Sequence, residues 1–184
     1  MDSRAVARIS LFAAMIAVLG LLPTFQLPVA GGVPITAQTL GVMLAGIVLG
    51  PRRGALAVLL LLFVVALGAP LLAGGRGGLG VFFAPSAGFL LGWVPGAFVT
   101  GVVMQRLAKA PVVAAALMAA IAGGILVVYG CGIVGLVIVA HMGALQAMLA
   151  TAVFLPGDLM KAVAAAFLAK AAEQAYPAAL GHRT

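Results

Sequence analysis

Long apolar runs alternate with short groups of charged or helix-breaking residues from one end of the chain to the other. An α-helix needs roughly 17–25 predominantly apolar residues to cross a bilayer, and the runs approach that length. They divide the chain into six expected spans, at residues 8–23, 35–50, 54–69, 86–107, 112–139 and 156–175. The pattern predicts an all-α integral membrane protein with six transmembrane helices in one domain, residues 1–184.

The last span is expected to begin at Pro156, because proline lacks a backbone N–H and is well tolerated as the first residue of a helix. From there the span has a length of roughly 30 Å, enough to cross the hydrocarbon core. Residues 143–154 are then predicted to form a short helix at the membrane surface or packed beneath it.

Composition supports a membrane protein, since 65% of the residues are hydrophobic and 7% are charged, against about 25% charged in soluble domains. With the N-terminus inside, eight of the ten basic residues fall on the inner side. These are Arg4, Arg8, Arg52, Arg53, Arg106, Lys109, Lys170 and Arg183. Because basic residues concentrate in cytoplasmic loops, both termini are predicted to be cytoplasmic.

Several other classes of protein are excluded by what the chain lacks. The net charge of +7 does not indicate nucleic-acid binding, because the basic residues form no patch with aromatic residues between them. The loop GGRGGLG lacks the lysine and hydroxyl residue of an ATP-binding phosphate loop. Arg4 and Arg8 precede an apolar run as in a signal peptide, yet no cleavage site and soluble domain follow, so a retained helix is expected.

An intramembrane enzyme would need an activated nucleophile with a base, or a metal with several ligands. His141 and His182 are expected on opposite sides of the membrane, and Cys131 is the only cysteine. The sequence therefore predicts a protein that is not an enzyme and that has no metal site and no cofactor.

Polar side chains concentrate in the outer half of the predicted bundle, while the inner halves are almost purely apolar. The set comprises Thr24, Gln26, Thr36, Gln38, Thr39, Arg76, Ser86, Asp158 and Lys161. Ionisable groups at membrane depth are costly and usually functional. A polar pocket that opens to the outside is the simplest explanation.

Asp158 and Lys161 are three residues apart, so they share one face of a helix. Asp158 also lies near the helix N-terminus, where the helix dipole favours a carboxylate. The pair is either a self-satisfied ion pair that orders the helix, or a site that offers one acceptor and one donor to a ligand.

Small residues recur at four-residue spacing in two spans, which allows close contact between helices. Gly88, Gly92 and Gly96 are expected to pack inside the bundle. Ala13 and Ala17 could instead form a docking surface for another membrane protein.

Three blocks of sequence resemble the BioY family, the biotin-specific S components of energy-coupling factor (ECF) transporters. They are GGVPITAQTLGVMLAGIVLGPRRGALAVLLLL, GAPLLAGGRGGLGVFFAPSAGFLLGW and FLPGDLMKAVAAAFLAK, in the family's order. The chain departs from the family at Ala37, where leucine is usual, and in the segment APSAGF.

The resemblance implies the ECF S-component fold, with high-affinity capture of biotin on the outer side of a bacterial-type cytoplasmic membrane. It also implies partners: a transmembrane T component, which docks on the Ala13 and Ala17 face, and two ABC ATPases that hydrolyse ATP. The alternatives are an S component of the same fold for another vitamin and a stand-alone biotin carrier.

Biotin has a ureido group at one end and a valerate carboxylate at the other. Asp158 is expected to accept hydrogen bonds from the ureido N–H groups, and Lys161 to donate to the ureido carbonyl or to another polar atom of the vitamin. Arg76, assisted by backbone N–H groups of its glycine loop such as that of Gly75, is expected to bind the carboxylate. In the alternative, Lys161 binds the carboxylate and Arg76 faces solvent.

Further contacts with the ligand are expected from Thr36, Gln38, Ser86 and Phe89, with Phe83 and Trp93 as possible apolar walls. The alternative for Thr36, Gln38 and the aromatic residues is a role in helix packing alone. The loop 24–35, which contains Gly31 and Gly32, is a candidate to close over the ligand.

Overall fold

The computed structural model describes residues 2–26, 33–176 and 180. Arg183, His182, Gly31 and Gly32 lie outside the described residues, so the predictions made for them are not addressed by the structure. The elements in chain order are α1 (Ser3–Leu19), β1 (Phe25–Gln26), β2 (Pro34–Ile35), α2 (Gln38–Leu49), α3 (Pro51–Ala66), η2 (Leu79–Phe83), α4 (Ala87–Arg106), α5 (Val112–Ala119), η3 (Ala120–Val127), α6 (Val128–Val139), α7 (Ala144–Ala152) and α8 (Leu155–Ala175).

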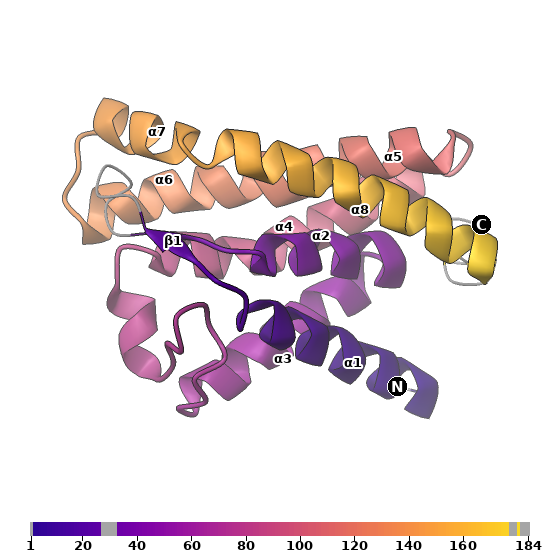
Figure 1. The fold of residues 1–184 in the computed structure, drawn as a ribbon, viewed down its shortest axis with the longest axis horizontal. Coiled ribbons are helices and arrows are strands. Elements are labelled where there is room, and N and C mark those ends of the chain that lie inside the picture. The colour runs from indigo at the N-terminus through magenta and orange to yellow at the C-terminus, as the bar shows by residue number, and fades with distance from the viewer. Residues whose placement is uncertain (1, 27–32, 177–179, 181–184) are drawn as a thin grey trace.

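The helices form one bundle in which α1 begins and α8 ends at the same end of the molecule (Figure 1). The segments α5, η3 and α6 make a continuous helix, Val112–Val139, whose middle eight residues are π-helical. This helix and α4 are each long and apolar enough to cross a membrane, and α7 with α8, bent by 50°, counts as a third span if the pair is one crossing.

The first three predicted spans have different bounds in the structure. Helix α1 covers Ser3–Leu19 rather than residues 8–23. Residues 34–35 pair with 25–26 in a two-stranded antiparallel hairpin, so α2 begins at Gln38 rather than at 35. The Thr36 hydroxyl accepts a hydrogen bond from the Gln38 N–H, 3.2 Å away, which favours a helix start at that point. Helix α3 begins at Pro51 rather than at 54, and Gly50, with φ at 78°, makes the turn from α2.

The end of the chain agrees with the prediction from Pro156. Helix α8 starts at Leu155 with the proline in its first turn, and α7 is a separate short helix. Figure 1 shows α7 and α8 following one another along the same edge of the bundle.

The glycines of α4 pack inside the bundle, as predicted. A Cβ atom at Gly92 would lie 2.7 Å from the Cys131 Cβ, and one at Gly96 would lie 2.9 Å from the Gly123 carbonyl oxygen. Gly88 packs against Gly135 in the same way. Helix α4 therefore contacts the α5–α6 helix at backbone distance along much of its length.

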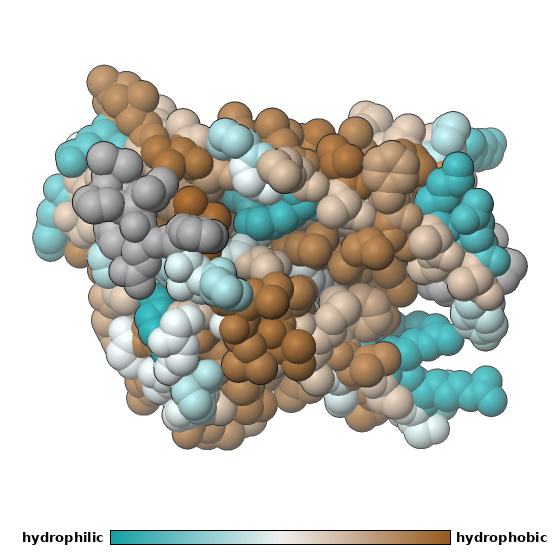
Figure 2. Space-filling view, viewed as in Figure 1, coloured by the Kyte–Doolittle hydropathy of each residue, from teal (hydrophilic) through white to brown (hydrophobic). Residues whose placement is uncertain are grey.

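The outer faces of the helices are apolar. Exposed side chains include Leu11, Leu59, Phe63, Leu126 and Phe167, and Figure 2 shows hydrophobic residues over most of the visible face of the bundle. Hydrophilic residues gather at the end where the two termini lie. A surface of this kind is typical of helices that face lipid.

Candidate ligand-binding site

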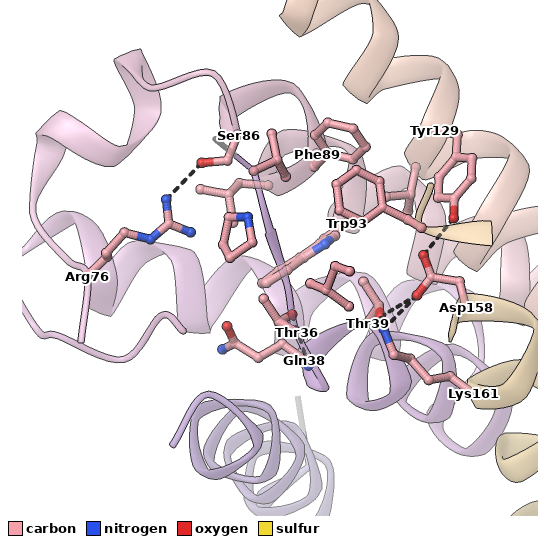
Figure 3. Close-up of a pocket in the computed structure, with 16 residues that line it drawn as sticks. Thr36, Gln38, Thr39, Arg76, Ser86, Phe89, Trp93, Tyr129, Asp158 and Lys161 are labelled. Carbon is pink, nitrogen blue, oxygen red and sulfur yellow. Dashed lines mark hydrogen bonds and ion pairs between the residues drawn. The ribbon is translucent and has the colours of Figure 1, made fainter. Parts of the chain in front are cut away.

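A cavity in the bundle gathers most of the predicted binding residues (Figure 3). The lining comes from β2, α2, the loop after α3, α4, α6 and α8 and consists of Val33, Pro34, Ile35, Thr36, Gln38, Thr39, Arg76, Ser86, Phe89, Leu90, Trp93, Val128, Tyr129, Phe154, Asp158 and Lys161. Of the predicted substrate-binding residues, Gly75 is the one outside this lining. It lies in the glycine loop with φ at 70°, a conformation that glycine adopts readily.

Asp158 is the centre of a hydrogen-bond network at one end of the cavity. Its Oδ1 accepts from Lys161 Nζ at 2.7 Å and from Thr39 Oγ1 at 3.0 Å, and its Oδ2 accepts from the Tyr129 hydroxyl at 2.8 Å. Lys161 also donates to Thr39 Oγ1 at 3.1 Å. Asp158 is buried, with 4% of its surface exposed, so the donors compensate for the loss of water around the carboxylate.

The network is not saturated. A carboxylate has about four acceptor positions and an ammonium group has three donors. The recorded bonds occupy three positions on Asp158 and two hydrogens of Lys161. Among the described residues, one acceptor position of Asp158 and one hydrogen of Lys161 therefore have no recorded partner.

Arg76 lies at the other end of the cavity (Figure 3). Its Nε donates to the Ala73 carbonyl at 3.2 Å and its Nη1 donates to Ser86 Oγ at 3.0 Å. The ion pair recorded among the described residues is Lys161–Asp158. No acidic side chain in that part of the chain therefore forms an ion pair with Arg76. Partial burial lowers the pKa of the Arg76 guanidinium, yet arginine stays protonated in proteins. The result is an uncompensated cation that faces the cavity.

Apolar side chains occupy the space between the two charged ends. In Figure 3, Phe89 and Trp93 lie between Arg76 on one side and Asp158 on the other. Phe89 packs edge-to-face on Phe154 and on Tyr129, with ring centroids 5.8 and 6.5 Å apart. Small-molecule sites commonly combine such apolar walls with a few polar anchors.

The polar atoms of Gln38 bond to the backbone of neighbouring elements, as the packing alternative for this residue expects. Its amide nitrogen donates to the carbonyl oxygens of Ile16 and Leu71, both at 3.1 Å, and its amide oxygen accepts from the Ala73 N–H at 3.0 Å. The side chain lines the cavity, but its polar atoms tie α1 and the glycine loop to α2. Gln38 therefore positions the loop that carries Arg76.

The lining residues that were missing from the predicted site include Tyr129, Phe154 and Thr39. Tyr129 and Phe154 lie in apolar stretches that, in the sequence, look like ordinary helix packing, and Thr39 was noted only as a polar residue in the outer half. The signal that could have indicated Tyr129 is its hydroxyl, because a buried tyrosine usually finds a hydrogen-bond partner. Phe83, named as a possible apolar wall, is 78% exposed and lies outside the lining.

The chain matches the family described as "BioY family" over residues 1–178. It is 50% identical to the biotin transporter BioY of Rhodobacter capsulatus, with 96% of this chain and 97% of that protein covered. It is also 50% identical to the biotin transporter BioY of Rhizobium etli, with the same coverage.

A solved structure shares the fold. The crystal structure of the S-component for biotin from an ECF-type ABC transporter superimposes with a TM-score of 0.86 at 27% sequence identity, over 95% of each chain. The fold is thus that of a transporter S component, a membrane protein. The chain belongs to the BioY family.

Proposed function

We propose that this protein captures biotin with high affinity at the outer face of the cytoplasmic membrane and serves biotin uptake as the S component of an ECF transporter. The observation that carries the proposal is the charge arrangement of the cavity. An uncompensated arginine at one end and an Asp158–Lys161 pair at the other, with apolar walls between, complement a ligand with a carboxylate at one end and a ureido group at the other.

At the paired end, Asp158 accepts a hydrogen bond from a ureido N–H, and Lys161 donates its remaining hydrogen to the ureido oxygen. Charge-assisted bonds of this kind are about twice as strong as neutral ones. At the other end, Arg76 binds the valerate carboxylate, and Ser86 holds the guanidinium in place. Phe89 and Trp93 pack on the fused rings and the tail.

The cavity has a volume of only about 50 Å³, whereas pockets for drug-sized ligands measure about 300–1,000 Å³. Biotin can enter only if part of the lining moves. Residues 33–36 are the candidates, because they comprise strand β2 and its two neighbouring residues rather than part of the packed helices.

The six-span topology with cytoplasmic termini belongs to the same proposal. The position of the α1 start and the α8 end at one end of the molecule supports an even number of crossings. The exposed Arg4, Arg52 and Arg106 support a cytoplasmic location for that end by the positive-inside rule. Helices α1, α2 and α3 are shorter than a full bilayer span, so their crossings involve the adjoining loops.

The partners are a T component and two ABC ATPases. Ala13 and Ala17 lie beside a hollow of about 220 Å³ between α1 and α3, and small residues on such a face allow a partner helix to approach closely. Ala13 is buried and Ala17 is half-buried, so both sit at the floor of this hollow. Energy for transport then comes from ATP hydrolysis in the partner subunits, with no cofactor in this chain.

Equilibrium binding of labelled biotin to the purified protein in detergent tests the proposal, with riboflavin and thiamin as competitors. We expect saturable binding that only unlabelled biotin displaces. Asp158→Asn removes the negative charge of the carboxylate to which Lys161, Thr39 and a ureido N–H donate hydrogen bonds. This change should weaken biotin binding about ten- to a hundredfold. The matched control is Asp2→Asn, at the exposed residue that precedes α1, and it should bind normally.

Each other outcome excludes a specific part of the proposal. Absence of biotin binding would contradict the function itself. Displacement by riboflavin or thiamin would favour an S component for another vitamin. Full binding by Asp158→Asn would leave the function standing and contradict the assigned contact.

A further inference from the structure

A second hollow, of about 660 Å³, lies on the outer surface of α1, α3 and α4 and shares no lining residue with the ligand cavity. Its walls are large apolar side chains, apart from Ser10. Leu59, Phe63 and Leu91 at its rim are 51%, 59% and 57% exposed. The hollow is therefore open to the hydrocarbon that surrounds the helices in a bilayer.

Two arginines adjoin one end of this hollow. Arg52 and Arg53 precede the lining residue Leu56 by four and three positions, so all three share one face of α3. Both arginines are exposed. The part of the chain that the structure describes records no ion pair for either of them. Two free cations thus lie next to an apolar hollow in the first turns of one helix.

We propose that the hollow is a binding site for an anionic phospholipid, with one acyl chain against α1, α3 and α4 and the headgroup phosphate at Arg52 and Arg53. A flexible acyl chain can fill an irregular apolar hollow, and its contacts restore the dispersion energy that empty space would forfeit. The arginines supply the charge complementarity, since each basic residue near an anionic lipid contributes about 1 kcal/mol.

The lining favours a lipid over a partner helix. Close contact between helices in a membrane uses small residues, and those are found in the neighbouring hollow beside Ala13 and Ala17. The larger hollow is lined instead by large side chains such as Leu59, Phe63 and Leu91, and these leave irregular gaps between them.

Native mass spectrometry of the purified protein, titrated with phosphatidylglycerol or with phosphatidylcholine of the same acyl chains, tests the proposal. We expect one phosphatidylglycerol to bind in clear preference to phosphatidylcholine. The double substitution Arg52→Gln and Arg53→Gln should weaken phosphatidylglycerol binding about ten- to thirtyfold. Arg106→Gln with Lys109→Gln removes the same charge from exposed positions at the end of α4 and after it, and should have little effect.

A second pair of variants tests the hollow itself. Leu59→Trp narrows the hollow and should weaken the preferred binding, whereas Leu126→Trp, on the exposed face of η3, should not. Size-exclusion profiles and thermal midpoints show that each variant is folded. Equal losses in both double variants, or unchanged binding in Leu59→Trp, would overturn the proposal. Loss of T-component association in Leu59→Trp with lipid binding intact would assign the hollow to the protein partner instead.

Discussion

Tyr129 holds the second oxygen of the Asp158 carboxylate, 2.8 Å from its hydroxyl, while Lys161 and Thr39 hold the first. With both oxygens bonded, the carboxylate has one orientation in the cavity. A ligand then meets a fixed acceptor and loses little entropy in aligning it. Tyr129 is therefore a positioning residue that acts through Asp158.

Tyr129→Phe removes one hydrogen bond from a charged group and should weaken biotin binding about five- to thirtyfold. Tyr176→Phe, at the exposed second tyrosine, is the control and should not change the affinity. Affinities of Tyr129→Phe, Asp158→Asn and the double variant, measured by equilibrium binding, form a double-mutant cycle. If the two effects simply add, the tyrosine does not act through Asp158.

Arg76 differs from Lys161 in having no acidic neighbour in the described structure, and this difference decides which cation should receive the carboxylate. Lys161 already shares its charge with Asp158 at 2.7 Å. A second anion beside that pair would meet the negative charge of Asp158, whereas one beside Arg76 would not.

Comparison of biotin with biotin methyl ester tests the role of Arg76, because the ester keeps the ureido group and has no charge on the tail. The natural chain should prefer biotin, and Arg76→Gln should reduce that preference at least tenfold. Arg106→Gln, at an exposed arginine, should retain it. A preference lost in Lys161→Gln but kept in Arg76→Gln would favour the opposite assignment of the two cations.

The contact between α4 and α6 depends on paired glycines. A Cβ atom at Gly135 would lie 2.6 Å from the Gly88 Cα and 2.8 Å from its nitrogen. Backbone atoms cannot move aside as a flexible side chain can. Since α4 carries Ser86, Phe89 and Trp93 at or near its start, this contact also fixes one wall of the ligand cavity.

Gly135→Ala should therefore lower the thermal midpoint of unfolding, with a loss of about 1–3 kcal/mol, the usual cost of overpacking. Gly130→Ala is the matched control on the same helix, because a Cβ atom there would meet nothing within 4 Å. The measurement is thermal unfolding of the purified proteins in one detergent. Equal midpoints for the two variants would contradict the packing described here.

The sequence predicted those elements whose bounds or packing faces are set by residues within the element itself. It did not predict the elements that depend on contacts between distant segments. The start of α8 follows from Pro156, and the internal face of α4 follows from three glycines at a spacing of four. The hairpin of residues 25–26 and 34–35 requires pairing between two segments, which periodicity within either one does not reveal. The π-helical stretch Ala120–Val127 is equally invisible, because its apolar sequence suits an α-helix as well.

At the scale of the whole molecule, the sequence indicated charged residues that line one cavity in the structure, but not which hydrogen bonds each of them makes. Asp158, Lys161 and Arg76 are conspicuous because ionisable residues are rare in this chain. Tyr129 and Gln38 obtained their roles from helices distant in the sequence, which only the assembled bundle brings within 3.1 Å of their partners. Whether the site binds biotin in the proposed orientation depends on all of these residues together.

An experimental structure of the protein with biotin tests this account most directly. It should show the ureido group against Asp158 and Lys161, the valerate carboxylate within hydrogen-bond distance of Arg76, and residues 33–36 displaced to enlarge the cavity. Biotin bound in the reverse orientation, or outside this cavity, would contradict the account.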